Sequence, residues 1–391
     1  MDYARYRDAL QAELAGTEAP FPAAEFQRRE DKLRQAMAER GLEAMLVTAP
    51  SDIFYLTGYN TFEVSVHACL VVAPGGVALQ VPSIETGPAV VCTRVSQLMG
   101  YRWEDTGGPL TPLVDLLEGT REIGYDPWQP GLRPAILDGL RSALPASRFH
   151  DAADLLPAMR RVKSAAELDH LYRSARITVA GLDAAEGVIS PGTTDSAVAA
   201  AGASAILKAG SEFMSMQPIV TTGTRSSVIH TNHNGTTLAP GDPVFMEFGA
   251  SIHRYTAPMM RTRVCGTPDR HMERIRTTCE ALFATLVEHM RPGRTFDAAA
   301  RAAEQVMAPV ADDVFFSGVF GYTVGAGFPP SWVEGSGFIA RGQETVFREN
   351  MVFHLPLCLR RPGEWGIGLS DTVRVTETGA VPLTDNSWQL A

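Results

Sequence analysis

Apolar residues in the first part of the chain follow helical and strand-like patterns in turn. Phe26, Leu33 and Met37 fall on one helical face of residues 23–40, and Gly41 follows as a stop signal. Short apolar runs typical of buried strands occur at residues 43–49, 67–74, 76–82 and 121–127. Strands separated by helical patterns predict an α/β domain.

A long amphipathic helix is predicted to begin near residue 165. Ser164 and Glu167 have the spacing of a capping box, in which each side chain satisfies a free backbone donor at the helix start. Leu168, Leu171 and Ala175 then recur at helical intervals. We therefore place a domain boundary just before this helix.

The rest of the chain mixes helices and strands without strict alternation. Helical patterns cover residues 193–210, 271–290 and 296–310. Strand-like runs cover residues 216–223, 242–251, 262–268, 351–359 and 371–383. Because this order fits α+β better than a parallel sheet, we predict two domains, an α/β domain at 1–160 and a second domain at 161–391.

Composition favours a soluble globular protein. The 391 residues are 45% hydrophobic and 20% charged, with a formal net charge of -10. That charge argues against nucleic acid or an anionic membrane as a partner. No apolar run suggests a membrane span, and the charged first residues lack a signal core, so we expect a cytoplasmic protein. Five widely spaced cysteines without a C-x-x-C pair are expected to be reduced.

Two side chains in neighbouring segments could carry acid–base chemistry. His230 lies in the polar stretch "VIHTNHNG", where it is either a general base or a surface histidine. Glu247 lies within the apolar run "PVFMEFGA". A carboxylate is costly to bury unless it is paired or neutral, so Glu247 is either a site residue or the outward member of an alternating strand.

Residues 321–337 read as a Gly-, Pro- and aromatic-rich loop. Tyr322, Phe328 and Trp332 could enclose a small cationic ligand, and Arg341 could hold a carboxylate. The alternatives are a rigid surface loop and a solvated arginine.

Metal-binding and nucleotide-binding motifs are absent from the sequence. There is no H-E-x-x-H, no P-loop, no dinucleotide-binding glycine motif and no G-x-S-x-G. The strands that could line a site carry Pro258, Pro356 and Ser370 in place of acids.

Taken in order, several short motifs resemble the pita-bread superfamily of methionine aminopeptidase, Xaa-Pro aminopeptidase, prolidase and creatinase. They are "FYLTGYN", "RRVKSAAELDHLYRSA", "LAPGDPVFMEFGA", "RYTAPMMRT", "GYTVGAGF", "ENMVFHLP" and "DTVRVTETGAVPLT". The resemblance covers nearly the whole chain. It implies a creatinase-like N-terminal domain and a pita-bread catalytic domain.

The resemblance also implies that no metal or other cofactor is bound. Metallopeptidases of this superfamily hold two metals with two Asp, one His and two Glu. The corresponding positions here are Glu247, Pro258, Tyr322, Pro356 and Ser370. One carboxylate cannot offset the charge of two divalent ions.

Creatinase, a metal-free member, has its catalytic histidine eleven residues before the glycine of a Gly-Asp turn. Counting back from Gly241 reaches His230. The chain departs from creatinase at Tyr322 and Pro329, where creatinase has histidines, and at Met260, where it has a glutamate.

The motifs are more similar to those of ectoine hydrolase, a metal-free enzyme that opens a cyclic amidine. The shared positions are Glu247, Arg254, Tyr255, Pro258, Tyr322, Pro329, Pro330, Trp332, Glu334 and His354. His67 also has a counterpart, in a loop that reaches into the partner subunit's pocket in these relatives. The resemblance therefore implies a homodimer.

Together these residues predict metal-independent hydrolysis of a C–N bond in a small, carboxylate-bearing cyclic amidine. His230 would be the general base and Glu247 would bind the amidinium. Tyr255, Tyr322, Phe328, Trp332, Glu334, Arg341, His354 and His67 would contact the substrate. The alternatives are a creatinase-type amidinohydrolase acting on a guanidino acid, a metal-dependent enzyme like the Xaa-Pro peptidases, and a non-catalytic binding protein.

Overall fold

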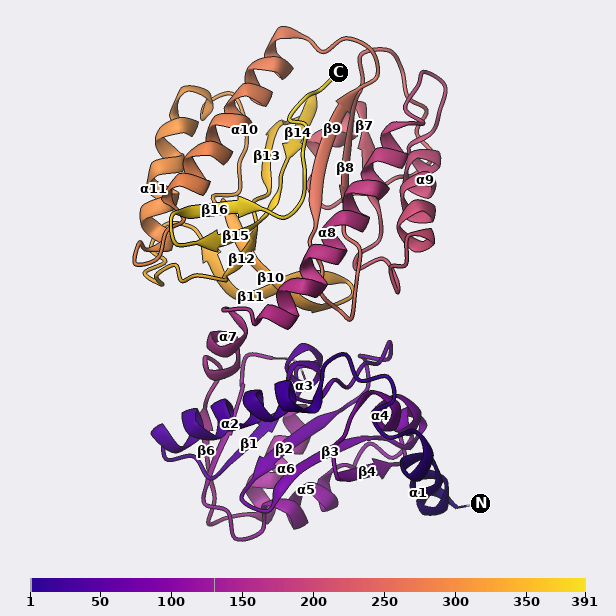
Figure 1. Cartoon of the computed structure of the whole chain (residues 1–391), viewed down its shortest axis with the longest axis vertical. Helices are drawn as coiled ribbons and strands as arrows, with labels where there is room; N and C mark the ends of the chain where they lie inside the picture. Colours follow the sequence, from indigo (N-terminus) through magenta and orange to yellow (C-terminus); the bar gives the residue numbers. More distant parts are fainter. Residues whose placement is uncertain (1, 130) are drawn as a thin grey trace. The chain divides into compact units, whose positions relative to one another are not determined.

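The computed structural model describes residues 2–129 and 131–391, which form two compact units, Met1–Met159 and Arg160–Ala391 (Figure 1). Each unit has apolar cores of its own. None of the described helices is long and apolar enough to cross a membrane. All five cysteines are buried free thiols.

The first unit is a mixed six-stranded sheet with helices on both faces, in the strand order β4-β3-β2-β1-β5-β6. Its strands are β1 (Ala44–Val47), β2 (Cys69–Ala73), β3 (Gly76–Pro82), β4 (Gln97–Tyr101), β5 (Glu122–Tyr125) and β6 (Arg148–Asp151). Its helices are α1 (Tyr3–Leu14), α2 (Ala23–Glu39), α3 (Pro50–Thr57), α4 (Thr86–Cys92), α5 (Leu110–Leu117) and α6 (Pro134–Ala143). Helix α7 (Leu155–Arg160) ends at the division between the units.

Alternate residues of the central strand β1 pack into cores on opposite faces of this sheet. Met45 packs with Leu33 of α2, whereas Leu46 packs with Leu140 of α6. Burial on both faces explains why β1 reads as a continuous apolar run in the sequence.

The second unit contains four long helices and three antiparallel sheets. The helices are α8 (Ala165–Glu186), α9 (Asp195–Lys208), α10 (Arg270–His289) and α11 (Phe296–Met307). The sheets are β7-β8-β9, β13-β14 and β11-β10-β12-β15-β16. Their strands are β7 (Ile219–Thr222), β8 (Pro243–Phe248), β9 (Met259–Val264), β10 (Gly321–Phe328), β11 (Ser331–Ile339), β12 (Val352–His354), β13 (Leu357–Arg361), β14 (Trp365–Leu369), β15 (Thr372–Thr376) and β16 (Gly379–Pro382).

The predicted capping box of α8 is confirmed. The backbone N–H of Glu167 donates to Ser164 Oγ at 3.3 Å, and the backbone N–H of Ser164 donates to Glu167 Oε2 at 2.9 Å. Helices α8 and α9 then cover β8. A Cβ atom at Gly202 of α9 would collide with the ring of Phe248, so a glycine is needed where this helix crosses the strand.

Two strand predictions are corrected by the structure. Residues 321–337, predicted as a loop, lie within a hairpin of β10 and β11 that turns at Pro329 and Pro330. The predicted strand 351–359 is interrupted between β12 and β13, where Pro356 has no N–H for a sheet hydrogen bond. These breaks place the ends of β10, β12 and β14 beside one another.

Candidate active site

Glu247 lies on β8 and its side chain faces the interior of the second unit. Met246 and Phe248 pack into the core formed with α8 and α9. Glu247 is directed to the opposite face, which it shares with Phe245, and it lies opposite Met260 in the register of β8 and β9. Glu247 is only 7% exposed. Strand alternation allowed its side chain to face either inward or outward, and in the structure it faces inward.

The Glu247 carboxyl forms no hydrogen bond or ion pair with any residue that the structure describes. Burial raises its pKa from the ordinary value near 4.5 to about 8, and the positive charge of Arg360 acts in the opposite direction. Burial therefore favours the protonated, neutral form of Glu247 at neutral pH.

A row of hydrogen-bonded side chains lies close to Glu247. The indole N–H of Trp332 donates to Tyr322 Oη at 2.9 Å, and the same oxygen lies 2.8 Å from His354 Nδ1. His354 Nε2 lies 2.6 Å from Ser370 Oγ. Ser370 Oγ also accepts the backbone N–H of Met260 at 2.7 Å. We call Tyr322, His354 and Ser370 the hydroxyl–imidazole cluster.

Burial keeps the hydroxyl–imidazole cluster uncharged. It lowers the pKa of His354 to about 3, so this imidazole is neutral and carries one N–H. His354 therefore donates to one hydroxyl neighbour and accepts from the other. Burial also raises the pKa of Tyr322 well above its usual range, and the charge of Glu247 adds to this effect, so Tyr322 remains a phenol.

Strand register brings these groups together. Tyr322 of β10 lies opposite His354 of β12. Ser370 directly follows β14, and its backbone N–H donates to the carbonyl of Met260 on β9 at 3.2 Å. Met260 in turn lies opposite Glu247. All three sheets of the unit therefore contribute to one site.

Two predicted contact residues, Tyr255 and Phe328, have structural contacts of their own. Tyr255 is fully buried, and its hydroxyl donates to Glu167 Oε1 at 3.0 Å, beside the helix cap. The ring of Phe328 lies 4.2 Å from the guanidinium carbon of Arg254, which also stacks on Phe213. Their part in substrate binding stays a prediction.

Glu334 and Arg341 form ion pairs of their own. Glu334 is buried, and its carboxylate lies 2.7 Å from Lys163 Nζ and accepts the hydroxyl of Ser336 at 2.8 Å. Arg341 pairs with Glu304 of α11 at 2.6 Å on the surface. No contact joins either residue to the hydroxyl–imidazole cluster in the part of the chain that the structure describes.

His230 lies in the segment between η2 (Gly223–Ser227) and β8. Its side chain is exposed, and its backbone φ of 54° is in the left-handed region. Asn232 fixes the segment by accepting the backbone N–H groups of Val220 and His233 at 3.0 and 2.7 Å. The structure does not bring His230 into hydrogen-bond contact with Glu247, and its role as a base stays a prediction.

His67 lies in the first unit, where it is buried. Its Nδ1 is 3.4 Å from the carbonyl of Gly131, and burial lowers its pKa to about 4. Its predicted contact with substrate stays a prediction.

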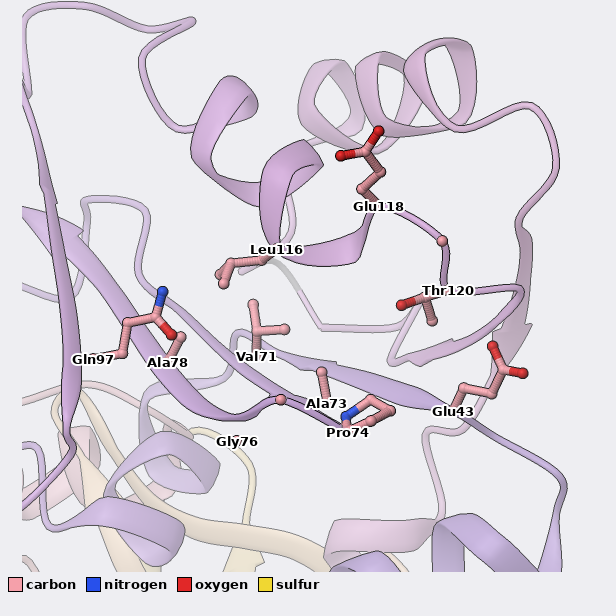
Figure 2. Close-up of a pocket in the computed structure, with 12 residues that line it drawn as sticks. Glu43, Val71, Ala73, Pro74, Gly76, Ala78, Gln97, Leu116, Glu118 and Thr120 are labelled. Carbon is pink, nitrogen blue, oxygen red and sulfur yellow. The ribbon is translucent and has the colours of Figure 1, made fainter.

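The first unit also contains a hollow of about 440 Å³ (Figure 2). It lies beside the turn between β2 and β3, and its charged lining groups are Glu43 and Glu118. Glu43 already accepts the backbone N–H of Arg121 at 2.6 Å. The hollow has no lysine, arginine or histidine in its lining and is separate from the site at Glu247.

Comparison with known protein families identifies the family to which the chain belongs. Residues 169–377 match metallopeptidase family M24, and residues 29–162 match the creatinase/prolidase N-terminal domain. The chain therefore belongs to family M24 and has the pita-bread fold, as predicted.

Individual relatives cover almost the whole chain. It is 25% identical to an ectoine hydrolase of Halomonas elongata, over 95% of this chain and 98% of the relative. It is 22% identical to an Xaa-Pro dipeptidase of Pyrococcus furiosus, over 93% and 100%. The crystal structure of the prolidase from Pyrococcus horikoshii superposes with a TM-score of 0.82 at 22% identity, over 93% and 100% of the two chains.

The residues present do not fit the pair of metal ions that the family name implies. At the positions assigned by resemblance, Glu247 is the only acid, and Ser370 Oγ is already bonded to His354 and to a backbone N–H. No group of three or more His, Cys, Asp or Glu that could hold a metal occurs among the described residues.

Arg360 was missed in the sequence. It lies on β13 near Glu247, and its charge acts on the Glu247 carboxyl. In "LCLRR" the apolar residues Leu357 and Leu359 alternate, which predicts that Cys358 and Arg360 share the other face of a strand.

We expect Glu247→Gln to change how stability depends on pH. The Glu247 pKa is raised in the folded chain, so between about pH 4.5 and 8 the folded state binds more protons than the unfolded state. The contribution of Glu247 to the free energy of unfolding is therefore highest below pH 4.5. It falls by up to ~1.4 kcal/mol per pH unit as the pH rises from 4.5 to 8.

Urea unfolding of wild type and Glu247→Gln at pH 5 and pH 8 measures this difference. The variant should lose less stability between the two pH values. Asp371, whose pKa burial also raises to about 8, is present in both proteins, so the comparison isolates Glu247. Equal losses in the two proteins would contradict a buried, unpaired carboxyl.

Proposed function

We propose that this protein is a hydrolase that cleaves a C–N bond in a small, carboxylate-bearing cyclic amidine without a bound metal. The observation that carries this proposal is the donor set: one buried, unpartnered carboxyl beside a neutral hydroxyl–imidazole cluster. By resemblance, Glu247, Tyr322 and Ser370 occupy positions where metallopeptidases of the superfamily hold metal ligands. Similarity to an ectoine hydrolase over 95% of the chain supports the substrate class.

Glu247 would provide recognition of the cation. An amidinium presents two N–H groups in a plane, which match the two oxygens of a carboxylate. Burial favours the protonated form of the Glu247 carboxyl. Binding of the cation would therefore release this proton and leave an ion pair among apolar side chains. Tyr322 and Trp332 lie at the same site and would contact the bound ring.

Hydrolysis then requires a water molecule and a base. His230 would take a proton from water as the oxygen bonds to the amidine carbon. The C–N bond would break in the tetrahedral intermediate, and the proton would pass to the departing nitrogen. The products are an open-chain amide and an amine on the same molecule.

A second candidate is an Xaa-Pro dipeptidase. Relatives of that name cover 93% of the chain. A peptidase of this kind would use a metal centre, for which this site offers one carboxyl group and otherwise neutral side chains.

A mass-spectrometric screen distinguishes the candidates. Chelator-treated protein, with and without added Mn²⁺, Co²⁺ or Zn²⁺, is incubated with ectoine and other cyclic amidine acids, with linear guanidino acids, and with Xaa-Pro dipeptides. We expect ring opening of a cyclic amidine acid at the same rate in all metal conditions. Turnover of dipeptides only after metal addition would overturn the proposal, and turnover of guanidino acids alone would favour an amidinohydrolase.

We expect His230→Asn to reduce kcat by about 10²–10⁴-fold, the usual contribution of a positioned acid–base group. Asparagine tolerates the left-handed backbone at this position and cannot act as a base. The exposed side chain makes no hydrogen bond with the described residues, so circular dichroism and thermal unfolding should be unchanged. His233→Asn, in the same segment, is the control; equal rates for both variants and wild type would remove His230 from the mechanism.

We expect kcat/KM for the cyclic amidine to rise with pH up to about 8. Glu247 must lose its proton to pair with the cation, so below its pKa the rate constant should increase about tenfold per pH unit. Initial rates from pH 5 to 9 test this, with Glu247→Gln as the comparison. A flat wild-type profile over this range would show that Glu247 does not meet a cation.

A further inference from the structure

The proposed substrate carries a carboxylate, and the arginine predicted to bind it lies elsewhere. Arg341 is held by Glu304 on the surface of the second unit. A carboxylate anchor near Glu247 must therefore come from another element. Arg360 of β13 has the required charge and position.

Arg360 and Glu247 lie beside one small apolar cluster, which Phe245, Met260 and Cys358 form. On β13, Leu359 packs into the core with α10 and α11, so Cys358 and Arg360 share the other face. Cys358 packs with Phe245, and the guanidinium carbon of Arg360 lies 5.6 Å from the centre of the Phe245 ring. Phe245 and Glu247 are two residues apart on β8 and share a face of that strand.

Within the described residues the guanidinium of Arg360 contacts Phe245 and Cys358 but has no acidic partner. Its Nε is buried without a hydrogen-bond partner, and no acid forms an ion pair with it in residues 2–129 or 131–391. The adjacent Arg361 differs, because it pairs with Glu364 at 2.9 Å. A buried N–H that lacks a partner costs stability, and a ligand oxygen could recover this cost.

The segment that leads to His230 is fixed to the same hairpin. Gly366 of β14 lies opposite Arg360 in the strand register, and its backbone N–H donates to Ser226 Oγ of η2 at 2.8 Å. A Cβ atom at Gly366 would collide with the Ser226 carbonyl, so the two segments are in close contact. Arg360 therefore lies near Ser226, which precedes His230 by four residues.

We propose that Arg360 is the anchor for the carboxylate of the substrate, and that Glu247 and Arg360 together form a site for a small zwitterion. The identity of the cationic group rests on the proposed function, whereas the anion subsite rests on the position of Arg360. A planar guanidinium can hold a carboxylate through two parallel N–H···O bonds. The positive charge of Arg360 also opposes the effect of burial on the Glu247 pKa, which agrees with their proximity.

The test compares acids with their uncharged counterparts. Binding of cyclic amidine acids and of the matching carboxamides is measured by calorimetry with wild type, Arg360→Gln, Arg360→Lys and Arg361→Gln. Wild type should bind the acid about 10–150-fold more tightly than the carboxamide, the range expected for hydrogen bonds to a charged group. Arg360→Gln should abolish this preference, Arg360→Lys should keep part of it, and Arg361→Gln should keep all of it.

Three binding results would contradict the role of Arg360 as the carboxylate anchor. Arg360→Gln that still prefers the acid, or wild type that binds no acid or does not distinguish acid from amide, would overturn it. Stacking on Phe245 alone would give Arg360 a structural role, which would lower the unfolding temperature without changing the preference. Turnover separates this inference from the proposed function: acid binding that needs Arg360 without any C–N cleavage would retain the anchor and reject the hydrolase.

Discussion

Burial of one carboxyl group without a partner is the constraint on which this site depends. An ionised acid among apolar side chains is unfavourable, so burial favours the protonated form of Glu247, and in the proposed site a cation would replace that proton. A neutral molecule bound at the same place would form no ion pair with Glu247 and would therefore gain less binding free energy. In the proposed site, the preference for a positively charged ligand group therefore follows from desolvation of the Glu247 carboxyl. No second acid is needed for this preference.

The surrounding groups are arranged so that they add no charge. Tyr322, His354 and Ser370 satisfy one another in a closed row, and a backbone N–H and an indole N–H complete it. The family fold persists with these side chains because strand pairing and apolar cores hold it together. The two groups proposed to bind the charges of the substrate lie on different sheets, Glu247 on β8 and Arg360 on β13, so sheet packing sets the distance between them.

Local sequence predicted the elements whose signals are local. The helix after Ser164 begins with a capping box that four residues define, and it formed as expected. The hairpin of β10 and β11 was read as a loop because its strands are rich in glycine and meet at two prolines. Strand β10 of this hairpin pairs with β12, which lies more than twenty residues later, and no local pattern reports such pairing.

The sequence by itself determined the family and the two-domain α+β layout, and it placed Pro258, Tyr322, Pro356 and Ser370 where the resemblance expects metal ligands, because residue identity alone fixes these. It left the direction of Glu247 open, since both faces of a doubly buried strand are apolar. Tertiary structure decided that Glu247 faces the hydroxyl–imidazole cluster and that Arg341 and Glu334 are paired elsewhere. It also decided that Arg360, and not Arg361, lies against Phe245, because only strand register determines which of two adjacent side chains faces inward.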